Sequence, residues 1–249
     1  MRRLVFAANW KMHIGPHEAR EYLKAFRTAY APHDDRAVWF FPPAVSLEAV
    51  ATAIRDRADL LAGAQDIHWE PKGAFTGAIS GPLAGHAGAR ATLIGHSERR
   101  HVFGETDEAT GKKVDAALKA ELIPVLCVGE TLAQREAGET LAVVTRQLAA
   151  ALAGLDGGTL ATVIIAYEPV WAIGTGKNAT PQDAAAVHHE IRAWLTGRGS
   201  RAARVLYGGS VNLKNAAALL AEPELDGVLV GGASLDPAGW AELVRTAAG

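Results

Sequence analysis

The stretch Ile123–Val128, with the sequence IPVLCV, consists of apolar residues at six consecutive positions. A half-exposed strand would alternate apolar and polar side chains, so an unbroken apolar run of this length is typical of a strand buried on both faces. The segments on either side, residues 107–120 and 132–153, carry helix-forming residues with apolar side chains at helical spacing. The run therefore predicts a buried strand between two helices, as in a parallel α/β sheet.

The same kind of run recurs along the whole chain. With 123–128 there are eight runs, and their starts are about 32 residues apart on average, close to the length of one strand–helix–strand unit. Thr180-Pro181 and Asp236-Pro237 each place a capping side chain before a proline, as at many helix starts. Eight parallel strands favour a closed barrel, with a doubly wound open sheet as the alternative. The other seven runs are residues 4–8, 37–41, 60–64, 92–94, 162–167, 204–207 and 227–230.

Composition limits the protein classes to consider. The chain has 249 residues, 49% of them hydrophobic, and a formal net charge of -2, which gives no support for binding nucleic acid or a membrane surface. The single Cys127 excludes an intrachain disulfide and a four-thiolate metal site. No apolar stretch approaches the ~20 residues of a membrane span. We expect one domain over residues 1–249, soluble and cytoplasmic.

Polar residues and glycines follow five of the predicted strands. Because the carboxyl ends of parallel strands meet on one face of a barrel, these residues are expected to share one rim. Taken alone, none of these residues indicates a function, since a glutamate after a strand is more often structural and a glycine pair usually only forms a turn. Their convergence indicates an active site. They are Asn9 and Lys11 after the first run, His96, Ser97 and Glu98 after the fourth, Glu168 after the sixth, Gly208, Gly209 and Ser210 after the seventh, and Gly231 and Gly232 after the eighth.

Seven motifs around these positions resemble those of the triosephosphate isomerase family, in the same order and at similar spacing. They are ANWKM at 8–12, GAFTG at 73–77, IGHSERR at 94–100, CVGET at 127–131, AYEPVWAIGTGK at 166–177, YGGS at 207–210 and VGGASL at 230–235. The resemblance covers nearly the whole chain and implies a single-domain (β/α)8 TIM barrel with outer helices. It implies an isomerase of glycolysis and gluconeogenesis that interconverts dihydroxyacetone phosphate and D-glyceraldehyde 3-phosphate through an enediol(ate), with no cofactor and no metal ion.

The resemblance also assigns chemical roles. Glu168 is implied to be the base that moves the proton, and the apolar neighbours Ile173 and Leu229 would make its carboxylate more basic by keeping water away. His96 is implied to be a neutral electrophile that polarises the carbonyl of the substrate. A helix that begins at Ser97 would disfavour the charged form of that ring.

An oxyanion and a phosphate dianion must be stabilised as well. Lys11 and Asn9 are implied to stabilise the developing oxyanion, with Lys11 also near the phosphate. Glycine lets the backbone approach an anion closely, so that backbone N–H groups can bind it. Residues 172–176 resemble the tip of a lid that closes over the substrate and excludes water. The implied substrate- and phosphate-binding positions are Asn9, Lys11, Gly174, Ser210, Gly231 and Gly232.

The resemblance further implies a homodimer. Residues 65–77 are expected to form a long loop that inserts into the partner subunit, with Thr76 reaching Asn9 and Lys11 of the partner subunit. A long ordered loop of this kind is unusual unless it binds something. Glu98 is expected to support the Lys11 region rather than to transfer a proton itself.

Two positions depart from the family pattern. Ala78 stands where glutamate is common, and Asp66 stands where asparagine is common. The missing glutamate removes one expected interface ion pair with Arg99, which is worth about 1 kcal/mol or less when partly exposed. The dimer is therefore expected to survive the substitution.

Two other functions fit parts of the sequence. A lyase or synthase barrel could use the same phosphate site after the seventh and eighth strands. A barrel kept only as a scaffold would be expected to lack at least one of the four catalytic side chains, yet Asn9, Lys11, His96 and Glu168 are all present.

Overall fold

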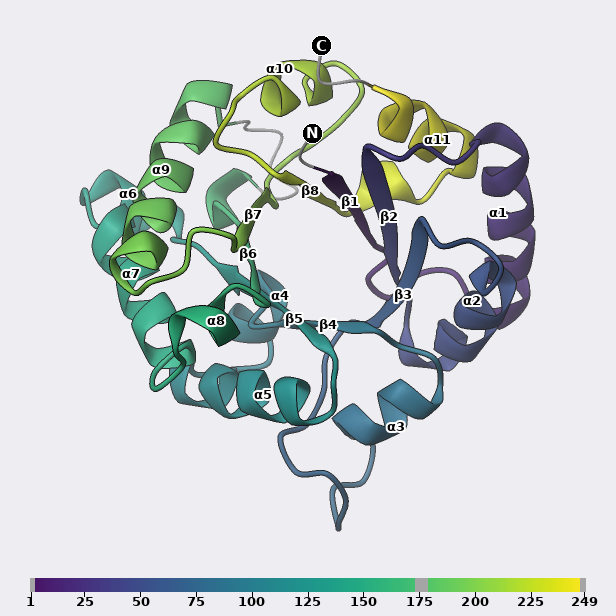
Figure 1. Cartoon of the computed structure of the whole chain (residues 1–249), viewed down its shortest axis with the longest axis horizontal. Helices are drawn as coiled ribbons and strands as arrows, with labels where there is room; N and C mark the ends of the chain where they lie inside the picture. Colours follow the sequence, from purple (N-terminus) through teal and green to yellow (C-terminus); the bar gives the residue numbers. More distant parts are fainter. Residues whose placement is uncertain (1–2, 173–178, 247–249) are drawn as a thin grey trace.

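The computed structural model describes residues 3–172 and 179–246. Within them, eight strands form a closed barrel in chain order, each parallel to the next, with helices outside the ring (Figure 1). The barrel prediction is confirmed, and the open sheet is rejected because β1 pairs with β8. The strands are β1 Leu4–Asn9, β2 Arg36–Phe41, β3 Leu60–Ala64, β4 Ala91–Ile94, β5 Ile123–Val128, β6 Ile164–Tyr167, β7 Arg204–Tyr207 and β8 Gly227–Val230.

Several helices begin directly after residues whose side chains accept hydrogen bonds from the first helical turn. The Thr180 hydroxyl accepts a hydrogen bond from the backbone N–H of Asp183 (3.1 Å), and Asp236 caps the last helix by accepting one from Gly239 (2.6 Å). The helices are α1 Pro16–Ala29, α2 Leu47–Ile54, α3 Gly81–His86, α4 Ser97–His101, α5 Asp107–Lys119, α6 Leu132–Glu136, α7 Thr140–Ala151, α8 Gly157–Leu160, α9 Pro181–Gly197, α10 Ala216–Leu220 and α11 Pro237–Arg245, with short 3-10 turns η1 Ala44–Ser46, η2 Val170–Ala172 and η3 Gly232–Ser234.

The predicted helical segment 132–153 is in fact two helices. Gly138 has φ 75°, a left-handed conformation that ends α6, and the chain resumes as α7 two residues later. The backbone N–H of Glu139 donates to the carbonyl of Gln134 (2.8 Å), which closes the intervening turn. The sequence pattern did not reveal this break, because the residues on both sides of Gly138 are helix formers with apolar side chains at helical spacing.

Two apolar layers fill the fold. One lies between the barrel and its helices, and the other fills the barrel itself, as expected when alternate side chains of each strand point inward. Cys127 belongs to the inner layer, where its side chain is a buried packing residue. The inner layer comprises Val5, Ala7, Ala37, Trp39, Phe41, Ala91, Leu93, Val125, Cys127, Ile164, Ala166, Leu206 and Leu229.

Strand register brings the candidate residues to one end of this rigid barrel. Asn9 pairs with Phe41 across β1 and β2, and Tyr167 pairs with both Val128 and Tyr207. The last residues of neighbouring strands are therefore level, and the segments that follow them form a single rim.

A long loop leaves the barrel between β3 and α3. Figure 1 shows it projecting well beyond the ring of helices. Its base is held by the hydrogen bond from the N–H of His68 to the carbonyl of Ile79 (2.7 Å), while residues 70–78 are exposed. No helix in the described part of the chain is long and apolar enough to cross a membrane.

Candidate active site

Glu168 follows β6 directly and is enclosed, with 2% of its surface exposed. Its backbone N–H donates to the carbonyl of Val128 (2.7 Å), which fixes the residue against the end of β5. Its Oε2 accepts a hydrogen bond from the backbone N–H of Ser97 (2.8 Å), and its Oε1 lies 3.3 Å from Nε2 of His96. A buried carboxylate is thus held beside an imidazole, an arrangement suited to proton transfer.

Two glycines make room for this glutamate. A Cβ atom at Gly129 would lie 1.8 Å from the carbonyl oxygen of Glu168, and one at Gly208 would lie 2.8 Å from its Cγ. Neither position tolerates a side chain while the base keeps its place. Gly208 was expected on the rim without this spacing role, and Gly129 was not singled out, because a close approach between distant segments leaves no local signal.

His96 caps the short helix α4. Its Nδ1 accepts a hydrogen bond from the backbone N–H of Glu98 (3.2 Å). A ring nitrogen that accepts carries no proton, so this bond selects the neutral tautomer with its proton on Nε2. Nε2 is the atom that faces Glu168 and the cavity, where an N–H group can polarise a carbonyl oxygen.

Lys11 is held in an uncommon backbone conformation, with φ 51°. Its N–H donates to Oδ1 of Asn9 (3.0 Å), and its carbonyl accepts from Nε2 of Gln65 (2.8 Å). The same Gln65 amide also donates to the carbonyl of Phe41 (2.8 Å). The Lys11 ammonium reaches Oε1 of Glu98 at 2.6 Å, as expected for a supporting role of Glu98. Gln65 was not predicted to contribute here.

One cavity of about 240 Å³ brings the predicted residues together. A Cβ atom at Gly231 would lie 3.2 Å from Cε of Lys11, so the cation and this backbone are already close. Ile173 and Gly174, also predicted at the site, lie outside the described residues. The lining residues are Asn9, Lys11, His96, Glu168, Gly208, Gly209, Ser210, Val211, Leu229, Gly231, Gly232 and Ala233.

The start of the segment after β6 is bonded to a second buried carboxylate. Glu130 is fully buried, and its Oε2 accepts from the hydroxyl of Tyr167 (3.1 Å) while its Oε1 accepts from the indole N–H of Trp171 (2.9 Å). Burial, and next the Glu130 charge, raise the pKa of Tyr167 well above its usual value. Glu130 thus connects the loop after β5 to the residues that follow Glu168.

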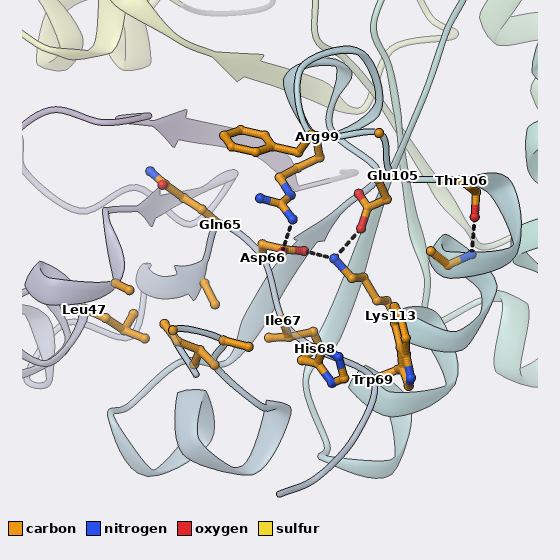
Figure 2. A pocket seen from close by; sticks show the side chains of 18 residues that line it. Leu47, Gln65, Asp66, Ile67, His68, Trp69, Arg99, Glu105, Thr106 and Lys113 are labelled. Atoms are coloured by element: carbon orange, nitrogen blue, oxygen red, sulfur yellow. Dashed lines mark hydrogen bonds and ion pairs between the residues drawn. The ribbon is translucent and has the colours of Figure 1, made fainter. Parts of the chain in front are cut away.

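A larger cavity of about 640 Å³ lies beside the base of the projecting loop (Figure 2). It contains an ionic cluster in which the Lys113 ammonium bonds Oδ1 of Asp66 (2.5 Å) and also pairs with Glu105, while Arg99 lies 3.2 Å from Asp66. Burial raises the pKa of Asp66, and Lys113 opposes that shift. Ala78 lines the same cavity.

The four predicted catalytic residues Asn9, Lys11, His96 and Glu168 all line the smaller cavity, and none of them lines the larger one. Thr76 lies exposed in the projecting loop and does not line the catalytic cavity of its own chain. Among the residues that the structure describes, no group of three or more His, Cys, Asp or Glu side chains is placed to hold a metal ion.

Comparison with known proteins identifies the relatives of this chain. A family model described as triosephosphate isomerase matches residues 4–247. The triosephosphate isomerase of Moorella thermoacetica is 48% identical over 248 residues, covering 98% of this chain and 99% of the relative. That of Solibacter usitatus is 46% identical, covering 98% of this chain and all of the relative, and that of Symbiobacterium thermophilum is 48% identical, covering all of this chain and 98% of the relative.

Proposed function

Because the chain belongs to the triosephosphate isomerase family and interconverts dihydroxyacetone phosphate and D-glyceraldehyde 3-phosphate in glycolysis, we propose that the proton is moved in the cavity around Glu168. The observation that carries this proposal is that the Glu168 carboxylate and Nε2 of His96 lie 3.3 Å apart on the wall that also presents Lys11. Family membership excludes the lyase or synthase and the scaffold as the main function.

The residues divide the chemistry among them. Glu168 takes a proton from the carbon beside the substrate carbonyl and returns it to the neighbouring carbon. The Nε2–H of His96 and the Lys11 ammonium stabilise the negative charge that develops on oxygen in the enediolate. Asn9 supports this arrangement by accepting the N–H of Lys11 (3.0 Å), which holds the strained backbone of that residue. Leu229 contributes apolar surface near the base.

The phosphate is bound on the side of β7 and β8. Ser210, Gly231 and Gly232 all line the cavity, and their backbones lie where chain segments turn away from the strand ends. Backbone N–H groups there, together with the positive charge of Lys11, complement a phosphate dianion. Gly174 is proposed to contribute a further N–H from the lid.

A homodimer is supported by the surface around the projecting loop. Large exposed apolar side chains occur in the segments that follow each of the four strands β1 to β4, and exposed apolar surface that is contiguous marks protein interfaces. In the proposed dimer, the loop of one copy enters the 640 Å³ cavity of the other, with Thr76 of the partner subunit approaching Asn9 and Lys11. The exposed residues are Met12, Val45, Phe75, Val102 and Phe103.

The cytoplasm is the proposed location, because the isomerisation belongs to glycolysis. Cys127 is buried in the barrel interior, so no described thiol is presented for oxidation at the surface.

Isomerisation in deuterium oxide tests the proton-transfer route. A shuttle through an enediolate exposes the transferred proton to exchange, so the product should carry solvent deuterium at the carbon that receives it, as read by proton NMR. The Lys11→Met variant, which loses the charge that stabilises the enediolate, should turn over more slowly by a factor of about 100 or more. Unlabelled product at full turnover would indicate a direct hydride shift and overturn the proposal.

A further inference from the structure

A hollow of about 610 Å³ opens at the end of the barrel opposite the catalytic cavity. Arg3 and Arg90 immediately precede β1 and β4, and Arg204 is the first residue of β7. Because the strands are parallel, residues at their amino ends lie together, away from the rim that carries Glu168. Arg55 and Arg57, from the turn after α2, complete a set of five arginines around the hollow.

The charge of this hollow is opposite to that of the whole chain. Among the described residues, five arginines and one carboxylate, Asp59, line it, so that four positive charges remain uncompensated, whereas the chain as a whole carries -2. Asp59 is bonded to Arg57 by two parallel hydrogen bonds of 2.7 Å. Within the described residues, Arg55, Arg90 and Arg204 form no ion pair.

Neighbouring acids do not neutralise the hollow. Asp35, just before β2, is bonded to Arg36 at 2.9 and 2.7 Å, and Asp56 is bonded to Arg27 at 2.6 Å. Glu121, two residues before β5 at the same end, does not line the hollow and forms no ion pair in the part of the chain that the structure describes. Asp226, just before β8, is bonded to Arg192 at 2.5 Å and to the backbone N–H of Val205 at 2.7 Å, and it does not line the hollow. Among the described residues, the excess positive charge therefore belongs to the lining of the hollow.

Part of the site is already held in place. Nε of Arg3 donates to the carbonyl of Arg36 (3.0 Å), and the Arg57 guanidinium lies 5.7 Å from the centre of the Tyr30 ring. The buried indole of Trp39 forms part of the wall. The basic side chains that line the hollow in the described part of the chain are all arginines, and the planar guanidinium group is the side chain best shaped to bind phosphate through two parallel hydrogen bonds.

We propose that this basal arginine pocket, formed by Arg3, Arg55, Arg57, Arg90 and Arg204, binds a small polyanion that carries two or more phosphate groups. Its volume suits a small molecule, since ligand cavities are typically about 300–1,000 Å³. Four uncompensated charges exceed what one phosphate dianion neutralises, so a triose phosphate, with its single phosphate, is not the ligand that this pocket matches. The pocket is thus a second site with its own ligand class.

Isothermal titration with inorganic tripolyphosphate tests the proposal. The titration is run at constant ionic strength and with saturating, equilibrated triose phosphates, so that the catalytic cavity is occupied throughout. We expect one saturable site per chain. Arg90→Gln and Arg204→Gln should each weaken binding by about tenfold or more, because each removes charged hydrogen bonds to the anion. Arg20→Gln is the matched control, an exposed arginine on α1 that does not line the pocket and should leave the affinity unchanged.

A thermal scan gives an independent readout. Tripolyphosphate should raise the unfolding midpoint of the wild type and of Arg20→Gln, since a ligand of the folded state stabilises it, but not that of the Arg90→Gln/Arg204→Gln double variant. The midpoints without ligand show whether each variant is folded. Absence of saturable binding, loss of binding when triose phosphate is present, or equal weakening by Arg20→Gln would each overturn the proposal.

Discussion

The backbone N–H of Ser97 donates a hydrogen bond of 2.8 Å to Oε2 of Glu168. This bond fixes one carboxylate oxygen at the first residue of α4, while the other oxygen faces Nε2 of His96 at 3.3 Å. A base that takes a proton from carbon must bring an oxygen to the substrate, and Oε1, which accepts no hydrogen bond from the described residues, is the oxygen available for that contact. The length and rotation of the glutamate side chain are therefore part of the mechanism.

Shortening that side chain should affect turnover more than binding. Glu168→Asp keeps the carboxylate but withdraws it by about one carbon–carbon bond, and a displacement of about 1 Å costs on the order of a hundredfold in rate. We expect kcat to fall by that factor or more with little change in KM, and to fall further in Glu168→Gln. Steady-state kinetics in both directions measure this. Glu21→Gln, an exposed position on α1, is the control, and near-normal turnover of Glu168→Gln would show that another group is the base.

The tautomer of His96 is a second expectation. Because Nδ1 accepts the N–H of Glu98 at 3.2 Å, the ring should be neutral with its proton on Nε2 at working pH. Nitrogen-15 NMR of the labelled ring distinguishes the two tautomers and the charged form. A proton on Nδ1 would contradict the hydrogen bond from Glu98 and remove the neutral-electrophile role.

The Glu130 cluster makes a third prediction. Glu130→Ala removes the acceptor of the Trp171 indole N–H and that of the buried Tyr167 hydroxyl, and leaving a buried hydroxyl such as Tyr167 unpaired costs about 1–3 kcal/mol. Glu130→Gln keeps a carbonyl oxygen and should cost less. Urea unfolding compares the two, and kinetics should show a higher KM in Glu130→Ala, because the segment after Glu168 loses its attachment. Equal stability of the two variants would contradict the role assigned to these bonds.

The barrel was predictable because each of its strands can be recognised from its own stretch of sequence. A strand covered on both faces needs apolar side chains at successive positions, and IPVLCV at 123–128 shows this without reference to any other segment. Asn9, His96 and Glu168 were predictable for a related reason: each follows such a strand, and parallel strands end on a common rim. The site residues described here thus follow from strand position and residue type together.

Other parts depend on contacts between residues far apart in the chain. Gln65 matters because it bonds Lys11, 54 positions away, and Glu130 because it bonds Trp171, 41 positions away. Nothing next to either residue indicates its partner. Both nevertheless lie just beyond the ends of β3 and β5, so applying the strand-end rule to all eight strands would have made them candidates.

The projecting loop supplies a fourth prediction. Replacing residues 70–77 by a short glycine linker, with the His68–Ile79 bond kept, should give a monomer in sedimentation velocity at micromolar concentration. Its turnover should fall, because the proposed contact with Asn9 and Lys11 of the partner subunit is lost. A shortened chain that is monomeric yet turns over normally would separate the loop from catalysis, and one that remains dimeric would place the interface elsewhere.

His188 predicts how stability changes with pH. Its ring is fully buried on α9, Nδ1 lies 3.3 Å from the carbonyl of Glu224, and burial is the main cause that lowers the pKa of His188 from 6.5 to about 3. Between these values the unfolded chain binds a proton that the folded chain does not. The contribution of this residue is therefore complete above pH 6.5 and is lost as the pH falls, by about 1.4 kcal/mol per pH unit.

Urea unfolding at fixed protein concentration, from pH 7.5 to pH 5, measures this slope. His188→Gln, which does not titrate, should lower stability at every pH through lost ring packing but flatten its decline below pH 6.5. The adjacent His189 is the matched control, because its side chain is 67% exposed and lies 3.4 Å from Glu224. His189→Gln should keep the slope of the wild type. An unchanged slope in His188→Gln would show that the ring takes up its proton in the folded state, contrary to the low pKa that burial gives it.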